Sequence, residues 1–151
     1  MAKKKIQMKD APRYHKVLDM QEDLSIYRDG HVKNNEKYFV NDLGIRSLYF
    51  DNEKDIGQAL ENVVYLELRR RGYDIYVGKF DDKEVDFVAV DGEKKLYVQV
   101  TYLLAEQSTI DREFSVLEEI DDNYPKIVIS MDKINRSRNG IIHKNIVDFL
   151  L

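Results

Sequence analysis

The sequence predicts an α/β fold in which helices pack on a mixed β-sheet. Three observations lead to this prediction: an amphipathic helix over residues 56–71, three β-prone segments directly after it, and a second amphipathic helix over 109–120 followed by another strand. The resulting order, α-β-β-β-α-β, is typical of a sheet covered by helices. With 151 residues, 43% of them apolar, the chain can form one compact core.

The strongest helix prediction covers residues 56–71. Asp55 precedes the helix, where its carboxylate can cap the first turn. Gly72 follows it, where a left-handed residue commonly ends a helix, and the arginines at 69–71 suit the negative end of the helix dipole. The helix is amphipathic because its apolar residues recur at i, i+3, i+4 and i+8, which places on one face Leu60, Val63, Val64 and Leu68.

Short runs of β-branched and aromatic residues follow this helix. Asp91-Gly92, between the second and third runs, is a strong hairpin signal. Pro125 stands directly before a further apolar run and marks an element boundary. We therefore expect strands at 73–80, 84–90, 95–102 and 126–130, and a final short strand and turn of helix within 141–151.

The N-terminal third of the chain is less periodic than the rest. We expect a tail or short helix over the first twenty residues, an irregular hairpin built from 24–27 and 38–40, and a helical turn that opens at 42–44. The predicted division is an N-terminal segment over residues 1–50 and one domain over residues 51–151.

Composition excludes several classes of function. The chain contains no cysteine, which removes disulfides, Cys-ligated zinc, iron–sulfur clusters and thiol nucleophiles. No apolar run is long enough to span a bilayer, and the Lys-rich start is not followed by the apolar stretch of a secretory signal. We therefore expect a cytoplasmic protein that has no membrane partner.

Charge limits the contacts that the chain can make with nucleic acid. The 24 basic and 28 acidic residues give a formal net charge of −4. Basic side chains gather in two stretches, 1–16 and 133–144, while residues 104–124 are strongly acidic. DNA would therefore contact one face, and its binding is expected to be weak and sensitive to salt.

Several common motifs are missing from the sequence. Neither a Walker phosphate loop nor the Gly-x-Gly-x-x-Gly pattern of dinucleotide sites occurs. His15, His31 and His143 are far apart in the sequence, so we expect three separate surface residues and no histidine metal site.

An acidic pattern follows the helix and the strands. Glu61 lies one turn into the long helix, Asp86 lies early in the second strand, and Gln99 lies on the third. Side chains alternate along strands, so Asp86 shares a face with Glu84 and Val88, and a hairpin at 91–92 can bring that face beside Gln99. Two carboxylates and an amide oxygen can bind a hard divalent ion such as Mg²⁺ or Mn²⁺.

These residues resemble the motif of the PD-(D/E)XK nuclease superfamily, whose core has the same α-β-β-β-α-β order. The nearest likeness is to archaeal Holliday-junction resolvases, through Gly57-x-x-x-Glu61, the Arg-Gly-Tyr at 71–73 and Val85-Asp86. This resemblance implies a restriction-endonuclease-like fold in which Glu61, Asp86 and Gln99 bind Mg²⁺ for phosphodiester cleavage. The family has Glu-x-Lys on the third strand, whereas this chain has Gln99-Val100-Thr101.

A second resemblance covers most of the chain from about Leu24. It is to the C-terminal nuclease-like domain of prokaryotic, archaeal-type AAA ATPases, in which an ATPase core and a winged-helix segment come first. It implies a longer parent protein or a shortened relative, an ATPase core as partner, and a winged-helix remnant within 1–50. The segments that carry the likeness are 37–44, 60–72, 77–79, 84–87, 97–102, 124–126 and 146–151.

Two functions remain open from the sequence. One is a Mg²⁺-dependent nuclease in which Lys79, at the end of the first strand, reaches Asp86 and replaces the missing motif lysine. The other is a catalytically inactive nuclease fold that binds nucleic acid or protein. Each candidate also has a plainer interpretation: Glu61 as a solvated helical residue, Gln99 as a buried hydrogen-bonding residue, and Lys79 as a solvated loop lysine.

The missing phosphate loop gives a first prediction. We expect the isolated chain not to bind ATP, because no glycine-rich loop is present to surround the phosphates with backbone N–H groups. Titration with a fluorescent ATP analogue measures this directly. Saturable binding at micromolar concentration would contradict the prediction.

Overall fold

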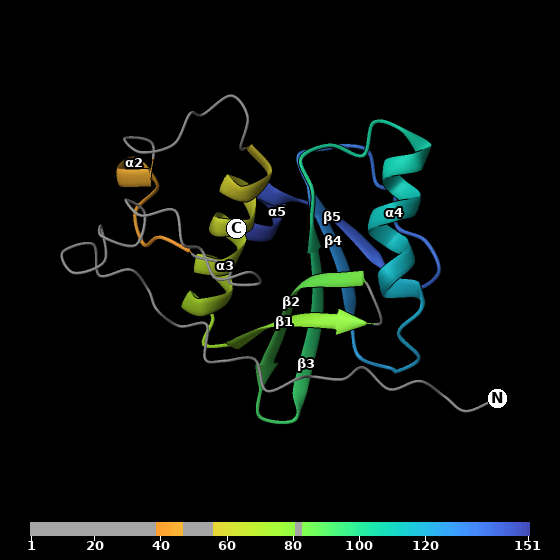
Figure 1. Ribbon diagram of the computed structural model, residues 1–151, viewed down its shortest axis with the longest axis horizontal. Helices are drawn as coiled ribbons and strands as arrows, with labels where there is room; N and C mark the ends of the chain where they lie inside the picture. The colour runs from red at the N-terminus through yellow and green to blue at the C-terminus, as the bar shows by residue number, and fades with distance from the viewer. Residues whose placement is uncertain (1–38, 47–55, 81–82) are drawn as a thin grey trace, which may run out of the picture.

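The computed structural model describes residues 39–46, 56–80 and 83–151, and it confirms the α/β prediction: a five-stranded mixed sheet flanked by helices (Figure 1). In the order β1-β2-β3-β4-β5, the first three strands pair antiparallel and the last two pairings are parallel. The elements are α2 (Leu43–Arg46), α3 (Ile56–Arg70), β1 (Asp74–Phe80), β2 (Lys83–Asp91), β3 (Lys94–Val100), α4 (Gln107–Glu118), β4 (Lys126–Ser130), β5 (Ile142–Asn145) and α5 (Ile146–Leu150).

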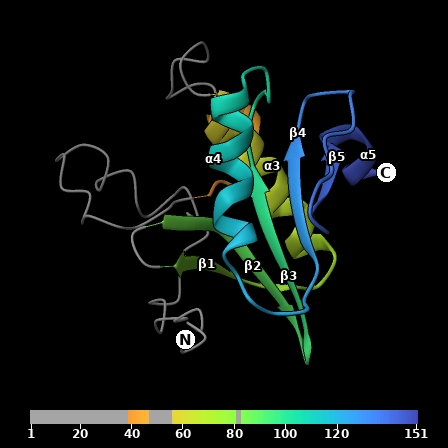
Figure 2. The ribbon, with the colours of Figure 1, turned by 90° about the vertical axis from the view of Figure 1, so that its right-hand side faces the viewer.

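Two apolar cores lie on opposite faces of the sheet. Helices α3 and α5 cover one face, where Val64 and Leu68 pack with Phe87. Helix α4 covers the other, where Phe114 and Leu117 are fully buried. Figure 2 shows α4 packed over the strands. This helix is the crossover between β3 and the parallel strand β4. Both faces of the central strands are therefore removed from water.

The two predicted glycine positions end their elements as expected. Gly72 has φ of +89° just after α3, and the N–H of Tyr73 donates to the carbonyl of Leu68, which is the Schellman pattern of a helix C-terminus. Gly92 has φ of +58° and forms, with Glu93, a two-residue hairpin turn between β2 and β3.

A β-bulge interrupts the pairing of β1 with β2. Tyr76 pairs with Val88 and Gly78 pairs with Val85, so only Val77 lies opposite two residues, Asp86 and Phe87. The side chains of β2 were expected to alternate strictly between the two faces of the sheet, and that expectation is wrong. Because of the extra residue, Val85 and Val88 point into the same core on the α4 face.

Gly78 permits the close approach of the strands at the bulge. A Cβ added there would lie 2.9 Å from side-chain atoms of both Val85 and Val88. Any larger residue would push the two strands apart, so this position accommodates the bulge that displaces Asp86.

The segment before α3 belongs to the same core as the sheet. Phe39 stacks on Tyr65 with ring centroids 4.3 Å apart. The Asn62 side chain accepts from the N–H of Val40 at 2.7 Å and donates to its carbonyl at 2.8 Å. The domain boundary expected at residue 51 stays a prediction, but buried contacts cross it.

Two further N-terminal predictions have different outcomes. Phe39 and Val40 are not in a strand, and the rest of the hairpin expected from 24–27 and 38–40 lies outside the described residues. The helical turn expected at 42–44 is present as α2, where the Asp42 carboxylate accepts from the N–H of Gly44.

His143 was expected at the surface, but it is buried at the end of the sheet. The N–H of Arg136 donates to its Nδ1, so Nε2 carries the hydrogen and lies 2.9 Å from Ser130 Oγ, which in turn donates to Asp132. Burial lowers the pKa of His143. Neighbouring polar groups explain why this imidazole can be buried. The other two histidines lie outside the described residues.

The second basic stretch, 133–144, is partly neutralised by α4. Arg138 pairs with Asp111 at 2.7 Å and with Glu118 at 2.9 Å. Its guanidinium also lies over the ring of Phe114, 4.8 Å from the centroid. This arginine therefore fastens α4 to the β4–β5 connection and adds little to a DNA-binding face.

The arginines at the end of α3 likewise have structural partners. Arg70 donates twice to the buried Glu67, and Arg71 donates to it once and also to the carbonyl of Phe149 in α5. The hydrogen bonds from Arg70 lower the pKa of Glu67 to about 2. Arg71 thus links the end of α3 to the C-terminal helix α5.

We expect Glu67→Gln to lower the free energy of unfolding at pH 7 by about 1–2 kcal/mol, since the neutral amide attracts the guanidinium groups less strongly. The pKa of Glu67 is lower in the folded chain than its ordinary value of 4.5. The advantage of the wild type is therefore complete above pH 4.5 and disappears as the pH falls towards 2.

Urea unfolding at pH 7, 4.5 and 2.5 measures this difference. The exposed Arg69 provides a control, because Arg69→Gln changes the charge of the same helix end without touching Glu67. A loss of stability in Glu67→Gln that is equal at all three pH values would contradict the lowered pKa of Glu67 in the folded chain.

Candidate active site

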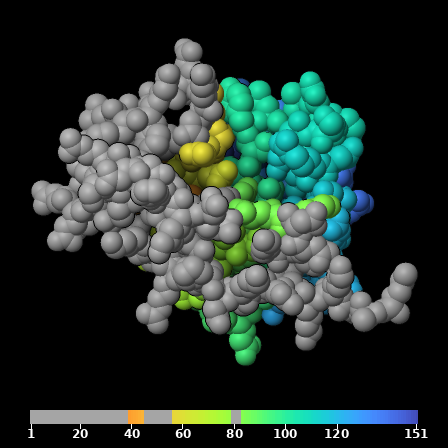
Figure 3. Space-filling view, viewed as in Figure 1, coloured from red at the N-terminus to blue at the C-terminus, as the bar shows by residue number. Residues whose placement is uncertain are grey.

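A pocket of about 580 Å³ opens where the ends of the two central strands meet α3 and α4. Figure 3 shows the face on which α3 (yellow) and the segment leading into α4 (blue-green) reach the surface beside each other, with strand residues (green) below them. The pocket is lined by Gly57, Glu61, Lys83, Glu84, Asp86, Gln99, Val100, Thr101, Tyr102, Arg112, Glu113, Ser115 and Val116.

The three residues singled out from the sequence line this one pocket. Glu61 comes from α3, Asp86 from the bulge in β2, and Gln99 from the end of β3. Because β2 and β3 are the second and third strands of the sheet, the pocket lies at the ends of two neighbouring inner strands.

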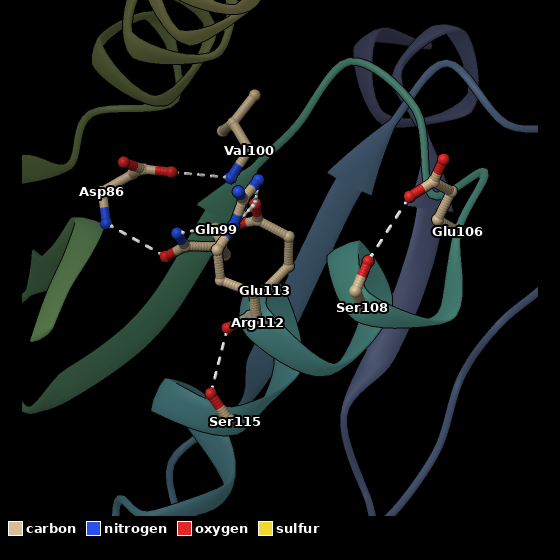
Figure 4. Close-up of polar contacts among 8 residues, drawn as sticks. All are labelled: Asp86, Gln99, Val100, Glu106, Ser108, Arg112, Glu113 and Ser115. Carbon is tan, nitrogen blue, oxygen red and sulfur yellow. Dashed lines mark hydrogen bonds and ion pairs between the residues drawn. The ribbon is translucent and has the colours of Figure 1, made fainter.

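Asp86 closes the β2–β3 ladder with its side chain. The last regular pair is Phe87 with Val98, and one step further the Asp86 Oδ2 atom accepts from the N–H of Val100 at 2.9 Å (Figure 4). The carboxylate thus takes the place of a backbone carbonyl. Only 7% of Asp86 is exposed, so this N–H compensates part of the cost of burying the charge.

Gln99 lies between two acidic residues. Its Oε1 accepts from the N–H of Asp86 at 3.3 Å, and its Nε2 donates to Glu113 Oε2 at 3.1 Å (Figure 4). These two contacts fix which way the amide faces: the nitrogen turns to α4 and the oxygen turns to Asp86. The oxygen, on the same side as the Asp86 backbone N–H, is a neutral donor group in the pocket that also contains the Asp86 carboxylate.

Glu113 is a site residue that the sequence analysis missed. It is 6% exposed, and its Oε1 accepts from Arg112 Nε at 3.1 Å and Nη2 at 2.7 Å. One sequence signal was available: Glu113 falls three residues after Ile110 and four before Leu117, on the apolar face of α4. An acid on such a face needs polar partners, and here they are Arg112 and Gln99.

The donors in the pocket suit a hard divalent cation that keeps much of its water. Among the residues that the structure describes, no three His, Asp or Glu side chains form a ready-made metal cluster. Asp86 and Gln99 lie side by side, and Glu61 lines the same pocket. Mg²⁺ is commonly bound by one or two carboxylates together with water and substrate phosphate, so this oxygen donor set fits it.

Thr101, where the resemblance to PD-(D/E)XK nucleases would place a lysine, directly follows β3 and lines the pocket without a positive charge. The backbone of Lys79 pairs with Glu84, two residues before Asp86, in the antiparallel pair of β1 and β2. The Lys79 side chain is not among those that the structure describes, so its reach to Asp86 stays a prediction. Two cations whose side chains are described do line the pocket, Lys83 and Arg112, and neither was predicted as a site residue.

Comparison with known proteins gives relatives but no function. No family model matches the chain. It is 40% identical over 124 residues to an uncharacterised protein of Haemophilus influenzae, covering 81% of this chain and 30% of that protein. It is 35% identical over 97 residues to an uncharacterised protein of Methanocaldococcus jannaschii, covering 62% and 21%. The chain therefore spans less than a third of the length of these curated relatives.

None of the helices in the described ranges is long and apolar enough to cross a membrane.

The contact between Gln99 and Glu113 gives a prediction about the pocket. Gln99→Glu would place a carboxylate where an amide nitrogen now donates to Glu113 at 3.1 Å. We expect it to lower the free energy of unfolding at pH 7 by about 1–3 kcal/mol, because a carboxylate at this half-buried position then faces the buried carboxylate of Glu113. The loss should shrink as the pH is lowered, because protonation of either carboxyl group removes the repulsion.

Urea unfolding of the single variant and of the exchanged pair, Gln99→Glu with Glu113→Gln, measures this effect. The exchange restores one donor and one acceptor, so it should recover most of the lost stability. If the exchanged pair is no more stable than Gln99→Glu alone, the hydrogen bond does not set the orientation of the amide.

Proposed function

We propose that this domain has a restriction-endonuclease-like core and acts as a weak Mg²⁺-dependent phosphodiesterase on DNA. The observation that supports this most strongly is the meeting of Asp86 and Gln99 at the separated ends of β2 and β3, in a pocket that also contains Glu61 and two cationic side chains. Fixed oxygen donors beside cationic groups are the parts that cleavage of a phosphodiester needs.

Each residue has a definite task in this proposal. Asp86, Gln99 and Glu61 would hold the metal, which when bound activates water and neutralises charge on the leaving oxygen. Gln99 keeps its oxygen towards Asp86 because Glu113 holds its nitrogen. One cation at the pocket wall would hold the phosphate against repulsion by the carboxylates.

One observation favours a second candidate, a catalytically inactive module that binds nucleic acid or protein. Thr101 provides no cation at the end of β3, and the polar groups of Gln99 and Glu113 already satisfy one another. In this alternative the hydrogen-bonded chain only stabilises the ends of the strands.

The setting of the domain is a proposal as well. The relatives are more than three times as long as the part that they share with this chain. In keeping with this, we propose that the domain works beside an ATPase core in longer cytoplasmic proteins, which would bring it to DNA despite its acidic charge.

Cleavage of labelled DNA in Mn²⁺ or Mg²⁺ tests the first candidate. We expect slow cutting by the wild type and at least a hundredfold loss in Asp86→Asn, together with weaker Mn²⁺ binding by calorimetry, because the variant loses the buried carboxylate. Asp74→Asn is a matched control, since Asp74 is exposed at the other end of the β1–β2 pair. An inactive wild type would favour the second candidate.

The role of Lys79 is tested in the same assay. If its ammonium replaces the motif lysine, Lys79→Ala abolishes cutting about as fully as the Asp86 variant while leaving Mn²⁺ affinity nearly unchanged. Undiminished cleavage by Lys79→Ala would remove Lys79 from the mechanism.

A further inference from the structure

We infer that Arg112, on the first half of α4, binds the phosphate group of a nucleic-acid strand at the mouth of this pocket. The inference takes the class of ligand, nucleic acid, from the proposed function, and it names the side chain that recognises that ligand. It follows from the charges around the pocket, from the partners of its cations, and from the way Arg112 is anchored.

Negative charge dominates the described lining of the pocket. Four carboxylates line it, against two cations, Lys83 and Arg112. A phosphodiester also carries a negative charge, so it approaches the carboxylates only where a cation compensates for the repulsion. Among the described side chains, the phosphate-binding group must therefore be Lys83 or Arg112; the carboxylates are Glu61, Glu84, Asp86 and Glu113.

Lys83 is directed to a partner that does not line the pocket. Its ammonium pairs with Glu119, just after the end of α4, and lies 3.5 Å from Ser115 Oγ. The charge of Lys83 is thus largely balanced by Glu119, next to the C-terminal end of α4. To reach a phosphate in the pocket it would have to give up this ion pair.

Arg112 has the opposite arrangement, because its partner is part of the pocket wall. Its side chain is 72% exposed, whereas that of Glu113, with which it pairs at 2.7 Å, is 8% exposed. Glu113 is in turn held by Gln99, which contacts Asp86 (Figure 4). A short chain of hydrogen bonds therefore connects the guanidinium with the proposed metal ligands.

The way the guanidinium is bound leaves room for a second acceptor. Arg112 uses Nε and Nη2, and both donate to the same oxygen of Glu113. A guanidinium has five N–H groups in a planar fork, so three more are available for a phosphate. Because Glu113 already limits the rotamers of Arg112, less entropy is lost when the phosphate binds.

Binding of a fluorescein-labelled 20-nucleotide single-stranded DNA, followed by anisotropy, tests the inference. Ca²⁺ replaces Mg²⁺, and a gel checks that the DNA stays intact. We expect Arg112→Ala to weaken binding about tenfold and to reduce the slope of log K against log salt by about 0.7, as loss of one phosphate contact on a single strand requires. Arg112→Lys should recover part of the affinity. Lys83→Ala, the matched control, should change it less than twofold.

The outcomes separate this inference from the proposed function. Equal binding by the wild type and Arg112→Ala, a larger effect of Lys83→Ala, or no saturable binding by the wild type would each overturn the role of Arg112. If the wild type binds through Arg112 but cuts no DNA in Mn²⁺, the phosphodiesterase proposal fails and the inference stands. If it cuts DNA and Arg112→Ala binds and cuts equally well, the inference fails and the proposed function stands.

Discussion

The hydrogen bond from the N–H of Val100 to the Asp86 carboxylate is the contact on which the pocket depends. The regular ladder between β2 and β3 ends at the pair of Phe87 and Val98. The buried N–H of Val100, which lies beyond that pair, still has an acceptor, because the Asp86 carboxylate takes the place of a backbone carbonyl. The strands can separate there because a side chain takes over the pairing. The bulge supplies that side chain, since the extra residue in β2 shifts Asp86 out of the regular alternation. The pocket is thus a consequence of local strand geometry.

Burial on both sides makes this geometry rigid. The strand segment that carries Asp86 has Val85 in the core beneath α4 and Phe87 in the core beneath α3. Rotation of this strand would expose one core or the other, and each fully buried side chain of this size contributes about 1.5–3 kcal/mol to the free energy of unfolding. A charged residue is therefore held in place mainly by its apolar neighbours, and its polar contacts set the orientation of the carboxylate.

Local patterns predicted the elements well because those elements follow from local chemistry. The strand at 126–130 has the predicted limits. Gly72 ends α3 and Gly92 forms part of a hairpin turn, in both cases because glycine readily adopts a positive φ. The bulge could not be predicted, because the run from Glu84 to Val90 reads as one regular strand and the irregularity arises only when Gly78 packs against it. Glu113 and His143 were missed for a related reason: the partners that permit their burial come from other elements.

Helix α3 carries both a contact to the Phe39–Val40 segment and a residue of the pocket. On its core side, Asn62 binds both backbone polar groups of Val40, and the preceding residue, Glu61, lines the pocket. Neighbouring residues of a helix move together, because their backbones share one ladder of hydrogen bonds. Because Asn62 and the stacking of Phe39 on Tyr65 fix the Phe39–Val40 segment to α3, we expect a change in that segment to alter the position of Glu61 as well.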